Sequence, residues 1–460
     1  MQEFDALVIG GGTGNIVASA AAAEGYDVAL FEKERIGGTC LNRGCTPSKM
    51  LIQRANLANT VREAARFGVH AHIDELDVAG FVEAVNTTNA NAADAMTAAK
   101  REQANLTLVE REVWFVDDHT VEDGDGERYT GERVVVATGS RPFVPPIDGL
   151  DDVDYLTSRE ALRLRKIPDE LIVLGGGYIA AELGYYFDAL GSRVTIVEML
   201  DTLLPREDED VAREFTEIAS SRHEVYTGYR ATAVRGRNGR IEVVAEREDG
   251  DVVTVAGDEL LVAVGRKPNT DAIGLETTGV SVDDAGFVET DDYLRTTVDG
   301  VWAMGDVADN SMFKHTADYE ADLVVENVFR GGDHPADFDA VPHAIFTEPQ
   351  VGGVGRTEGE LREAGVDYVV GTAQFSDTSM ARALKLEEGF VKVLAAPSGE
   401  ILGVHVLGHE ASVLVHEAVV AMKHGLSVHD VAETIHAHPA LSKVVREGFA
   451  DAAAAVDGRG

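Results

Sequence analysis

The fold is decided by the stretch Leu7-Val8-Ile9-Gly10-Gly11-Gly12-Thr13-Gly14-Asn15. It begins as the apolar run of a buried strand, turns at Gly10, Gly12 and Gly14, and leads into an alanine-rich helix. Such glycines let the backbone approach a phosphate, and the helix N-terminus attracts its charge. A second strand, Val28-Ala29-Leu30-Phe31-Glu32, ends roughly 20 residues later in an acid suited to a ribose hydroxyl. The pattern predicts a dinucleotide site, and Asn15 replaces only the third glycine, which serves helix packing.

The same pattern occurs a second time in the chain. Its strand and turn are Leu171-Ile172-Val173-Leu174-Gly175-Gly176-Gly177-Tyr178, and the strand that follows is Val194-Thr195-Ile196-Val197-Glu198. One glycine-rich turn alone is weak evidence, because an ordinary tight turn also uses glycine. Strand, glycines, helix and acid at two places predict an α/β protein with two Rossmann-like dinucleotide-binding domains.

Composition restricts the function further. The chain has 460 residues, 80 acidic against 40 basic residues, and a net charge of −40. Phosphate would be repelled, so we expect no nucleic acid partner. The acids are spread along the chain and only ten residues are lysines, a composition typical of a surface kept hydrated in concentrated salt, so we expect a halophilic source. The sequence shows no membrane-length apolar run and no signal peptide, which predicts a cytoplasmic protein.

The only two cysteines, Cys40 and Cys45, lie five positions apart, shortly after Glu32. A disulfide across so short a loop adds little stability and is easily reduced. Pro47 suits the first turn of a helix, whose N-terminus would stabilise a thiolate at Cys45. The alternatives are a metal pair or two inert core thiols. A metal would need further ligands at fitting spacing, so we expect no metal site.

The segment Gly37-Gly38-Thr39-Cys40-Leu41-Asn42-Arg43-Gly44-Cys45-Thr46-Pro47-Ser48-Lys49 resembles the active-site segment of the pyridine nucleotide-disulfide oxidoreductases, the family of glutathione reductase. The resemblance covers essentially the whole chain. Four further matches follow in the family's order: Ala137-Thr138-Gly139-Ser140, Ala263-Val264-Gly265-Arg266-Lys267-Pro268-Asn269, Ala303-Met304-Gly305-Asp306 and His436-Ala437-His438-Pro439.

This resemblance implies an FAD-containing enzyme with a glutathione-reductase-like fold and a C-terminal α+β dimerisation domain. It implies an FAD-binding domain over 1–149, a nicotinamide domain over 150–269, completion of the FAD or central domain over 270–336, and dimerisation over 337–460. FAD would be bound by Gly10, Gly12, Gly14, Glu32, Gly38, Thr39, Ala137, Thr138, Gly139, Gly305 and Asp306, and the nicotinamide by Gly175, Gly177, Tyr178, Glu198, Gly265 and Arg266.

The same resemblance implies the catalytic roles. Cys45 would be the thiolate next to the flavin, and Cys40 the thiol that attacks the substrate disulfide. Lys49 and Glu182 resemble the family's ion pair beside the flavin. His438 would protonate the departing thiol from the neighbouring subunit, which predicts a homodimer with shared active sites.

One position departs from the family. Members usually place a glutamate five residues after the catalytic histidine, and this chain has Lys443 there. A lysine would lower the imidazolium pKa, so either Glu433 or Glu447 replaces the glutamate, or Lys443 faces the substrate. Arg43, Lys443 and Arg446 are the candidate cations for an anionic substrate.

Details of the chain indicate which disulfide is reduced. Segments such as Thr13-Gly14-Asn15 and Lys314-His315-Thr316-Ala317-Asp318-Tyr319-Glu320-Ala321 resemble mycothione reductase, a member that acts on a low-molecular-weight thiol. Salt-loving archaea use γ-glutamylcysteine, so bis-γ-glutamylcystine is the expected substrate. The alternatives are a dihydrolipoamide dehydrogenase and a non-catalytic component of a multienzyme complex. Thiol-reductase relatives use NADPH, which is therefore the expected cofactor. NADH is possible because Glu198 would repel a 2′-phosphate, which Arg206 and Arg266 could otherwise reach.

Overall fold

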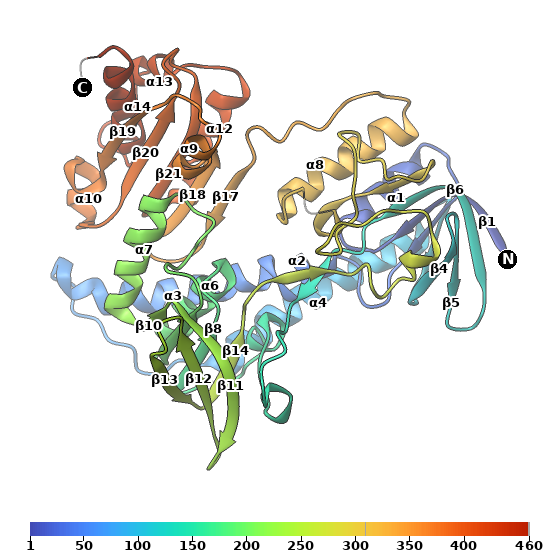
Figure 1. The fold of residues 1–460 in the computed structure, drawn as a ribbon, viewed down its shortest axis with the longest axis horizontal. Coiled ribbons are helices and arrows are strands. Elements are labelled where there is room, and N and C mark those ends of the chain that lie inside the picture. The colour runs from blue at the N-terminus through green and yellow to red at the C-terminus, as the bar shows by residue number, and fades with distance from the viewer. Residues whose placement is uncertain (309, 459–460) are drawn as a thin grey trace.

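The computed structural model describes residues 1–308 and 310–458, which form three lobes (Figure 1). The N-terminal lobe is built on a seven-stranded sheet in the order β3-β2-β1-β6-β5-β4, with β16 paired to β6. The strands β1, β2, β3, β6 and β16 run parallel, whereas β4 and β5 form an antiparallel hairpin on β6. Their bounds are β1 Gln2–Ile9, β2 Val28–Phe31, β3 Leu106–Val109, β4 Val113–Asp117, β5 Thr120–Asp123, β6 Arg128–Val136 and β16 Val301–Ala303.

Both glycine-rich stretches fold as predicted. β1 is buried over its last four residues and passes into α1 (Gly14–Ala23), while α8 (Lys314–Val324) packs beside α1 on the same sheet (Figure 1). Apolar strand residues are buried on both faces of the sheet. One face packs against α1 and α8, and the other against apolar residues of β4, β5 and the segment 273–288. Since β16 lies in this sheet, a segment that follows the second lobe in sequence completes the first lobe in space.

The second lobe contains a parallel four-stranded sheet in the order β10-β9-β8-β14 and an antiparallel sheet β11-β12-β13. A two-stranded pairing of β7 with β15 connects it to the first lobe. The elements are β7 Ser140–Pro142, α5 Ser158–Ala161, β8 Glu170–Leu174, α6 Tyr178–Ala189, β9 Arg193–Glu198, α7 Glu209–Arg222, β10 Glu224–Thr227, β11 Tyr229–Arg237, β12 Arg240–Arg247, β13 Val252–Gly257, β14 Glu259–Val262 and β15 Arg266–Pro268.

The C-terminal lobe is a five-stranded antiparallel sheet, β17-β18-β21-β20-β19, packed against helices. Residues 411–423 form two consecutive helices, α11 and α12, which meet at Val415, a residue that keeps helical dihedrals. The elements are β17 Pro342–Ile345, β18 Gln350–Gly355, α9 Glu358–Glu363, β19 Val369–Gln374, α10 Ser379–Leu384, β20 Phe390–Ala395, β21 Ile401–Gly408, α11 Ala411–Leu414, α12 His416–Lys423, α13 Val428–Glu433 and α14 Ser442–Val456.

Three helices follow the first glycine loop and β2, and they position the cysteines between the lobes. The short α2 (Gly38–Arg43) contains Cys40, and α3 (Cys45–Glu63) begins at Cys45 and packs against α6 of the second lobe. The long α4 (Val78–Glu102) packs against both α2 and α3. As expected, Pro47 lies in the first turn of α3.

A buried charged cluster joins the second and third lobes. Lys392 of β20, only 1% exposed, donates hydrogen bonds to Asp208 (2.8 Å), Asp210 (2.6 Å) and Glu358 (2.5 Å). Burial lowers the pKa of Lys392, but the three carboxylates outweigh burial and raise it.

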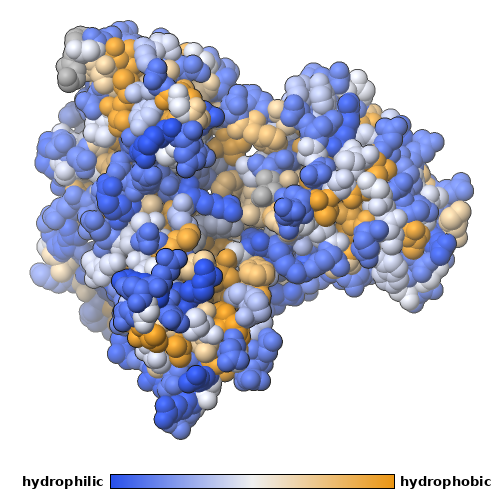
Figure 2. All heavy atoms as spheres, in the orientation of Figure 1, coloured by the Kyte–Doolittle hydropathy of each residue, from blue (hydrophilic) through white to orange (hydrophobic). Residues whose placement is uncertain are grey.

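The outside of the molecule is consistent with its charge. The face shown in Figure 2 is mainly hydrophilic, with small apolar groups between polar areas. Within the described residues, no helix is both long and apolar enough to cross a bilayer.

Candidate active site

One cavity brings together most of the residues expected to bind FAD and to carry electrons. Its walls come from the first glycine loop, α2, the start of α3, the start of α6 and the segments around 137–140, 266–273 and 304–317. Among the described residues, those lining this cavity all precede position 318.

Close backbone contacts explain the glycines of the first loop. Gly10 has φ +112°, and a Cβ there would lie 2.2 Å from the carbonyl oxygen of Ala137. A Cβ on Gly38 would lie 2.7 Å from the Cα of Gly12, so α2 closes directly on the loop. Asn15, at the place of the missing third glycine, donates its amide to the Gly12 carbonyl. The departure from the motif therefore closes the turn with a side chain.

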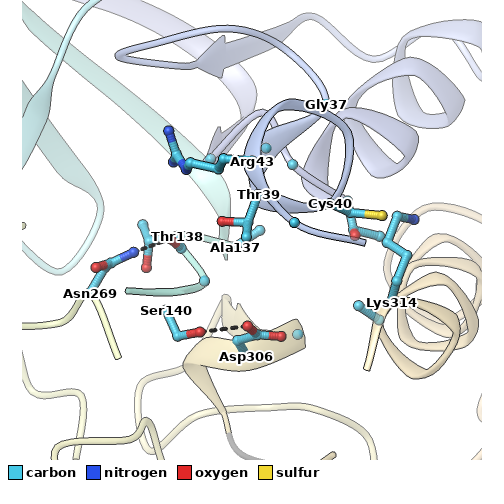
Figure 3. Close-up of a pocket in the computed structure, with 18 of the residues that line it drawn as sticks. Gly37, Thr39, Cys40, Arg43, Ala137, Thr138, Ser140, Asn269, Asp306 and Lys314 are labelled. Atoms are coloured by element: carbon cyan, nitrogen blue, oxygen red, sulfur yellow. Dashed lines mark hydrogen bonds between the residues drawn. The ribbon is translucent and has the colours of Figure 1, made fainter. Parts of the chain in front are cut away.

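Glu32 is held in place by the loop it serves. Its carboxylate accepts hydrogen bonds from the backbone N–H of Gly11 (2.9 Å) and of Glu34 (2.8 Å). Burial raises the pKa of Glu32. Arg43, a candidate substrate cation, forms an ion pair with Glu34 and acts electrostatically on Glu32. Its guanidinium therefore lies with the acidic groups at the Glu32 end of the cavity, turned away from Cys40 (Figure 3).

The second loop repeats this geometry. Gly175 has φ +104°, and a Cβ there would lie 2.5 Å from the Ala263 carbonyl oxygen. The carboxylate of Glu198, 6% exposed, accepts hydrogen bonds from the backbone N–H of Gly176 and of Leu200, the latter at 2.7 Å. A Cβ on Gly177 would meet no heavy atom within 4 Å, so this part of the loop is open.

Tyr178 and Arg266 approach the first cavity from the second lobe. Tyr178 is the first residue of α6 and lines the cavity, where burial raises the pKa of its phenol. Arg266 of β15, which follows Gly265 at φ +136°, donates to the hydroxyl and to the carbonyl of Ser140, both at 2.8 Å. The lobe that carries the second glycine loop thus forms part of the wall beside the cysteines.

The two cysteines behave as one titrating pair. Both are free thiols that line the cavity, and the Cys40 sulfur lies 3.9 Å from the hydroxyl of Thr46. A hydrogen bond from Cys45 outweighs the effect of burial and, together with the Thr46 hydroxyl and the charge of Lys314, lowers the pKa of Cys40 to about 6. The same hydrogen bond, together with burial, raises the pKa of Cys45, and the charge of Lys49 opposes this rise. The thiolate that forms near neutral pH is therefore at Cys40, whereas a thiolate at Cys45 was expected from the start of α3.

An ion pair beside the cysteines joins the two halves of the site. Lys49 of α3 donates to both carboxylate oxygens of Glu182 on α6, at 2.7 and 2.8 Å. The Glu182 side chain is 6% exposed and also accepts the backbone N–H of Phe346 at 3.1 Å. The Lys49 ammonium lies 4.8 Å from the centre of the Phe346 ring. The pair therefore holds the helix of the cysteines to the helix that follows the second loop.

A polar row crosses the opposite wall of the cavity (Figure 3). Asp306 accepts a hydrogen bond from the Ser140 hydroxyl at 2.5 Å, and Asn269 donates to the Thr138 carbonyl at 2.8 Å. Within residues 1–308 and 310–458, the Thr138 hydroxyl is buried without a hydrogen-bond partner. Gly305, at φ +72°, donates its N–H to the buried Glu320 at 2.5 Å.

Sequence reasoning assigned no role to Ser140, Asn269, Glu320 or Lys314, although all four support this wall or the cysteines. Ser140 and Asn269 belong to family motifs, but their hydrogen-bond partners, Asp306 and Thr138, lie far from them in the chain. Figure 3 shows Lys314 extending toward the sulfur of Cys40. The signal that could have identified Lys314 is its place as the first residue of a helix, where the helix dipole disfavours a cation.

These residues fit FAD. The close-packed glycines leave bare backbone for phosphates, Glu32 suits a ribose hydroxyl, and the unpartnered Thr138 hydroxyl and the Asp306 carboxylate offer hydrogen bonds inside the cavity. Thr39, Ala137 and Gly139 line the same wall, with Gly139 at φ +65°.

His438 lies elsewhere, in the C-terminal lobe. It is exposed between α13 and α14, in a separate groove that Lys443 and Glu447 also line. Lys443 and Arg446, the other two candidate substrate cations, donate to the same Glu447 oxygen at 2.8 and 3.2 Å. Lys443 thus turns to a carboxylate one helical turn onward. One chain does not bring His438 and the cysteines together.

His436, two residues before His438, has no role predicted from the sequence. Its ring is largely buried and lies 2.6 Å from a carboxylate oxygen of Glu417 on α12. This contact anchors the segment that carries His438 to the rest of the C-terminal lobe.

Comparisons with known proteins agree with this architecture. Residues 4–321 match the family model described as pyridine nucleotide-disulphide oxidoreductase, and residues 341–448 match the dimerisation domain of the same family. The chain is 39% identical to the dihydrolipoyl dehydrogenase of Haloferax volcanii, over 97% of this chain and 95% of that protein. It is 36% identical to the mycothione reductase of Mycobacterium tuberculosis, over 98% and 99%.

A solved structure is similar over nearly the full length. The HOCl-induced flavoprotein disulfide reductase RclA from Escherichia coli superimposes with a TM-score of 0.86 at 27% identity, covering 97% of this chain and 99% of that one. The fold, the paired dinucleotide loops and the sequence matches lead to one conclusion. The chain belongs to the pyridine nucleotide-disulphide oxidoreductase family and is an FAD-dependent member that uses NAD(P)H.

Proposed function

We propose that this enzyme reduces a low-molecular-weight disulfide, bis-γ-glutamylcystine, through Cys40 and Cys45, in the cytoplasm of a halophile. The observation that carries the proposal is the position of the two cysteines. They lie in the cavity that fits FAD, and Lys49 and Glu182 fasten them to the second dinucleotide loop. The net charge of −40 supports a salt-rich source, as does the similarity to a protein of Haloferax volcanii.

The residues of the chain divide the work. Glu32, Asp306 and the glycines around Gly10 and Gly38 would hold FAD, which when bound would supply two-electron transfer between the nicotinamide and the Cys40–Cys45 disulfide. Once reduced, the Cys40 thiolate attacks one substrate sulfur and forms a mixed disulfide, releasing the first thiol. Cys45 then attacks Cys40, which restores the protein disulfide and releases the second thiol. Each cycle transfers two electrons and two protons to the substrate.

Among the described residues that line the cavity there is no histidine to protonate the first leaving thiol. We propose His438 of the partner subunit as the proton donor, because residues 341–448 match a dimerisation domain and His438 is exposed. Mixed dimers of the Cys45→Ser and His438→Ala chains would have one intact site. Activity absent from verified mixed dimers would contradict the shared site.

For the nicotinamide, the geometry favours NADH over the NADPH expected from thiol-reductase relatives. Glu198 is fixed by two backbone N–H groups at the end of β9, where a ribose 2′-OH would be bound and a 2′-phosphate repelled. Arg206 is exposed after this strand and is the first cation that follows Glu198 in sequence, so it could offset the repulsion.

Dihydrolipoamide dehydrogenase is the second candidate, favoured by the 39% identity to the enzyme of Haloferax volcanii. The resemblance of the Lys314–Ala321 segment to mycothione reductase supports the small-thiol substrate, because this segment begins in the cavity beside Cys40.

The deciding experiment is turnover of the purified enzyme in concentrated potassium chloride with NADH and with NADPH. The panel contains bis-γ-glutamylcystine, mycothione, oxidised glutathione and lipoamide. We expect the highest kcat/KM on bis-γ-glutamylcystine. Preference for lipoamide would establish the alternative. If Cys45→Ser abolishes turnover on every disulfide yet preserves the cellular function, a non-catalytic role as a component of a multienzyme complex is favoured.

A further inference from the structure

Lys314 brings a positive charge toward Cys40, the thiol that attacks the substrate disulfide. It comes from α8, a helix that contains neither cysteine. It is the first residue of α8, lines the cavity, and extends toward the sulfur of Cys40 (Figure 3). The hydrogen bond from Cys45 lowers the pKa of Cys40 most, burial opposes it, and the hydrogen bond with Thr46 and then the charge of Lys314 lower the pKa further.

Helix stability does not explain a lysine at this position. The N-terminus of a helix is the positive end of its dipole, so a cation in the first turn is unfavourable. Lys314 forms an ion pair with Asp318 one turn along α8, which offsets part of that cost. The chain has only ten lysines, so a lysine in the cavity stands out against its background.

The other charges around the cysteines are largely committed. Lys49 gives two hydrogen bonds to the buried Glu182, and Asp306 accepts from Ser140. Lys314 differs, since its partner Asp318 is 43% exposed and water screens that carboxylate. On the cavity side, the groups that face Cys40 are the thiol of Cys45 and the hydroxyl of Thr46.

We propose that the Lys314 ammonium stabilises the thiolate of Cys40 and that Asp318 is the positioning residue that holds Lys314 toward the cavity. The inference rests on the proposed dithiol chemistry. In the step it serves, a bond forms between the Cys40 sulfur and one substrate sulfur while the substrate S–S bond breaks. The electron pair of that bond leaves on the departing sulfur, which takes a proton from His438 of the partner subunit. Lys314 itself is neither oxidised nor deprotonated.

The test measures the thiolate directly. The FAD-containing protein is reduced, freed of reductant, and alkylated with iodoacetamide, a neutral reagent, at a series of pH values in concentrated salt. Mass spectrometry assigns the label to Cys40 or Cys45. In the wild type we expect the Cys40 rate to rise with pH through a midpoint at about 6. In Lys314→Met the midpoint should move upward by roughly one pH unit, which is about a tenfold loss of thiolate below the midpoint.

Two variants control the result. Lys314→Arg keeps the charge and should restore most of the wild-type profile. Lys423→Met removes a lysine that also pairs with an aspartate, Asp337, but outside the cavity, and should leave the profile unchanged. Bound FAD and the melting temperature verify folding. An unchanged midpoint in folded Lys314→Met overturns the proposal, whichever disulfide the enzyme reduces.

The variant Asp318→Asn tests the role of Asp318 by the direction in which the Cys40 alkylation midpoint moves. If Asp318 positions Lys314, Asp318→Asn releases the ammonium and the Cys40 midpoint rises. If Asp318 only cancels part of the lysine charge, its removal lowers the midpoint, and the positioning role fails.

A final arm uses substrates. Thiolate stabilisation predicts that Lys314→Met lowers kcat/KM equally for a neutral disulfide, 2-hydroxyethyl disulfide, and for anionic bis-γ-glutamylcystine. A loss confined to the anionic substrate, with an unchanged alkylation profile, would make Lys314 a substrate contact and overturn the inference. If the cysteines accept no electrons from NAD(P)H, the proposed function fails, while the alkylation of chemically reduced protein still tests Lys314.

Discussion

The two glycine-rich loops share one backbone design and differ in how far the chain covers them. In both, a glycine at positive φ contacts a facing carbonyl and an acid accepts backbone N–H groups. The first loop is closed by Gly38 of α2, whereas Gly177 of the second faces open space. A closed loop suits a cofactor that stays bound, and an open one suits a cofactor that exchanges in every cycle. The two loops therefore differ in what packs on them and not in their backbone design.

The largest expected effect comes from adding one methyl group at Gly38, which packs on the first loop, compared with one at Gly177 of the second loop. Gly38→Ala would place a Cβ 2.7 Å from the Cα of Gly12, at a φ of +56°. The start of α2 would therefore have to move away from the first loop. We expect the variant to lose most of its FAD, measured as the ratio of flavin to protein absorbance after desalting. Gly177→Ala should keep its FAD and raise only the KM for the nicotinamide. Equal flavin loss in the two variants would contradict the difference between the loops.

Breaking the link between the loops should have the next largest effect. Lys49→Met leaves the carboxylate of Glu182 buried without its cation, which we expect to cost about 2 kcal/mol, less than a fully buried pair because Lys49 is about a third exposed. Unfolding in denaturant measures the loss, and stopped-flow spectroscopy should show slower flavin reduction. The double variant Lys49→Met/Glu182→Met should recover much of the stability. No recovery would mean that the pair is not the source of the loss.

Reversing a charge at the open loop should change selectivity without affecting the closed one. Glu198→Arg replaces the acid at the expected ribose position and should shift the ratio of kcat/KM values toward NADPH by about tenfold, or about 1.4 kcal/mol. The flavin content should stay at the wild-type level. A shift of the FAD content with no change in nicotinamide preference would show that Glu198 serves the fold and not the cofactor.

The smallest effect should come from a residue outside both loops. Lys443 pairs with Glu447 across one turn of α14, an arrangement worth about 0.3–0.5 kcal/mol when exposed. Lys443→Gln should therefore lower the free energy of unfolding by only that amount, with both cofactor affinities unchanged. A large rise in KM for bis-γ-glutamylcystine would return Lys443 to the set of substrate contacts.

The sequence was sufficient where short-range patterns determine structure. Apolar strands followed by Gly10 or Gly175 predicted both loops, and the placement of Cys45 at a helix start followed from Pro47. Contacts between distant segments could not be read in this way. Ser140 donates a hydrogen bond to Asp306 across 166 positions, and Asn269 donates one to the Thr138 carbonyl across 131 positions. The distance of His438 from the cysteines within one chain is likewise a property of the packed lobes.

The most direct test of the central claim counts thiols. The oxidised enzyme, reduced anaerobically with a small excess of NADH and then blocked with a thiol reagent, should gain two labelled cysteines per chain, at Cys40 and Cys45. Cys45→Ser should show no NADH-dependent gain. If the flavin is reduced in the wild type and no new thiol appears at either cysteine, electrons do not reach the pair, and the account of this protein as a dithiol disulfide reductase is wrong.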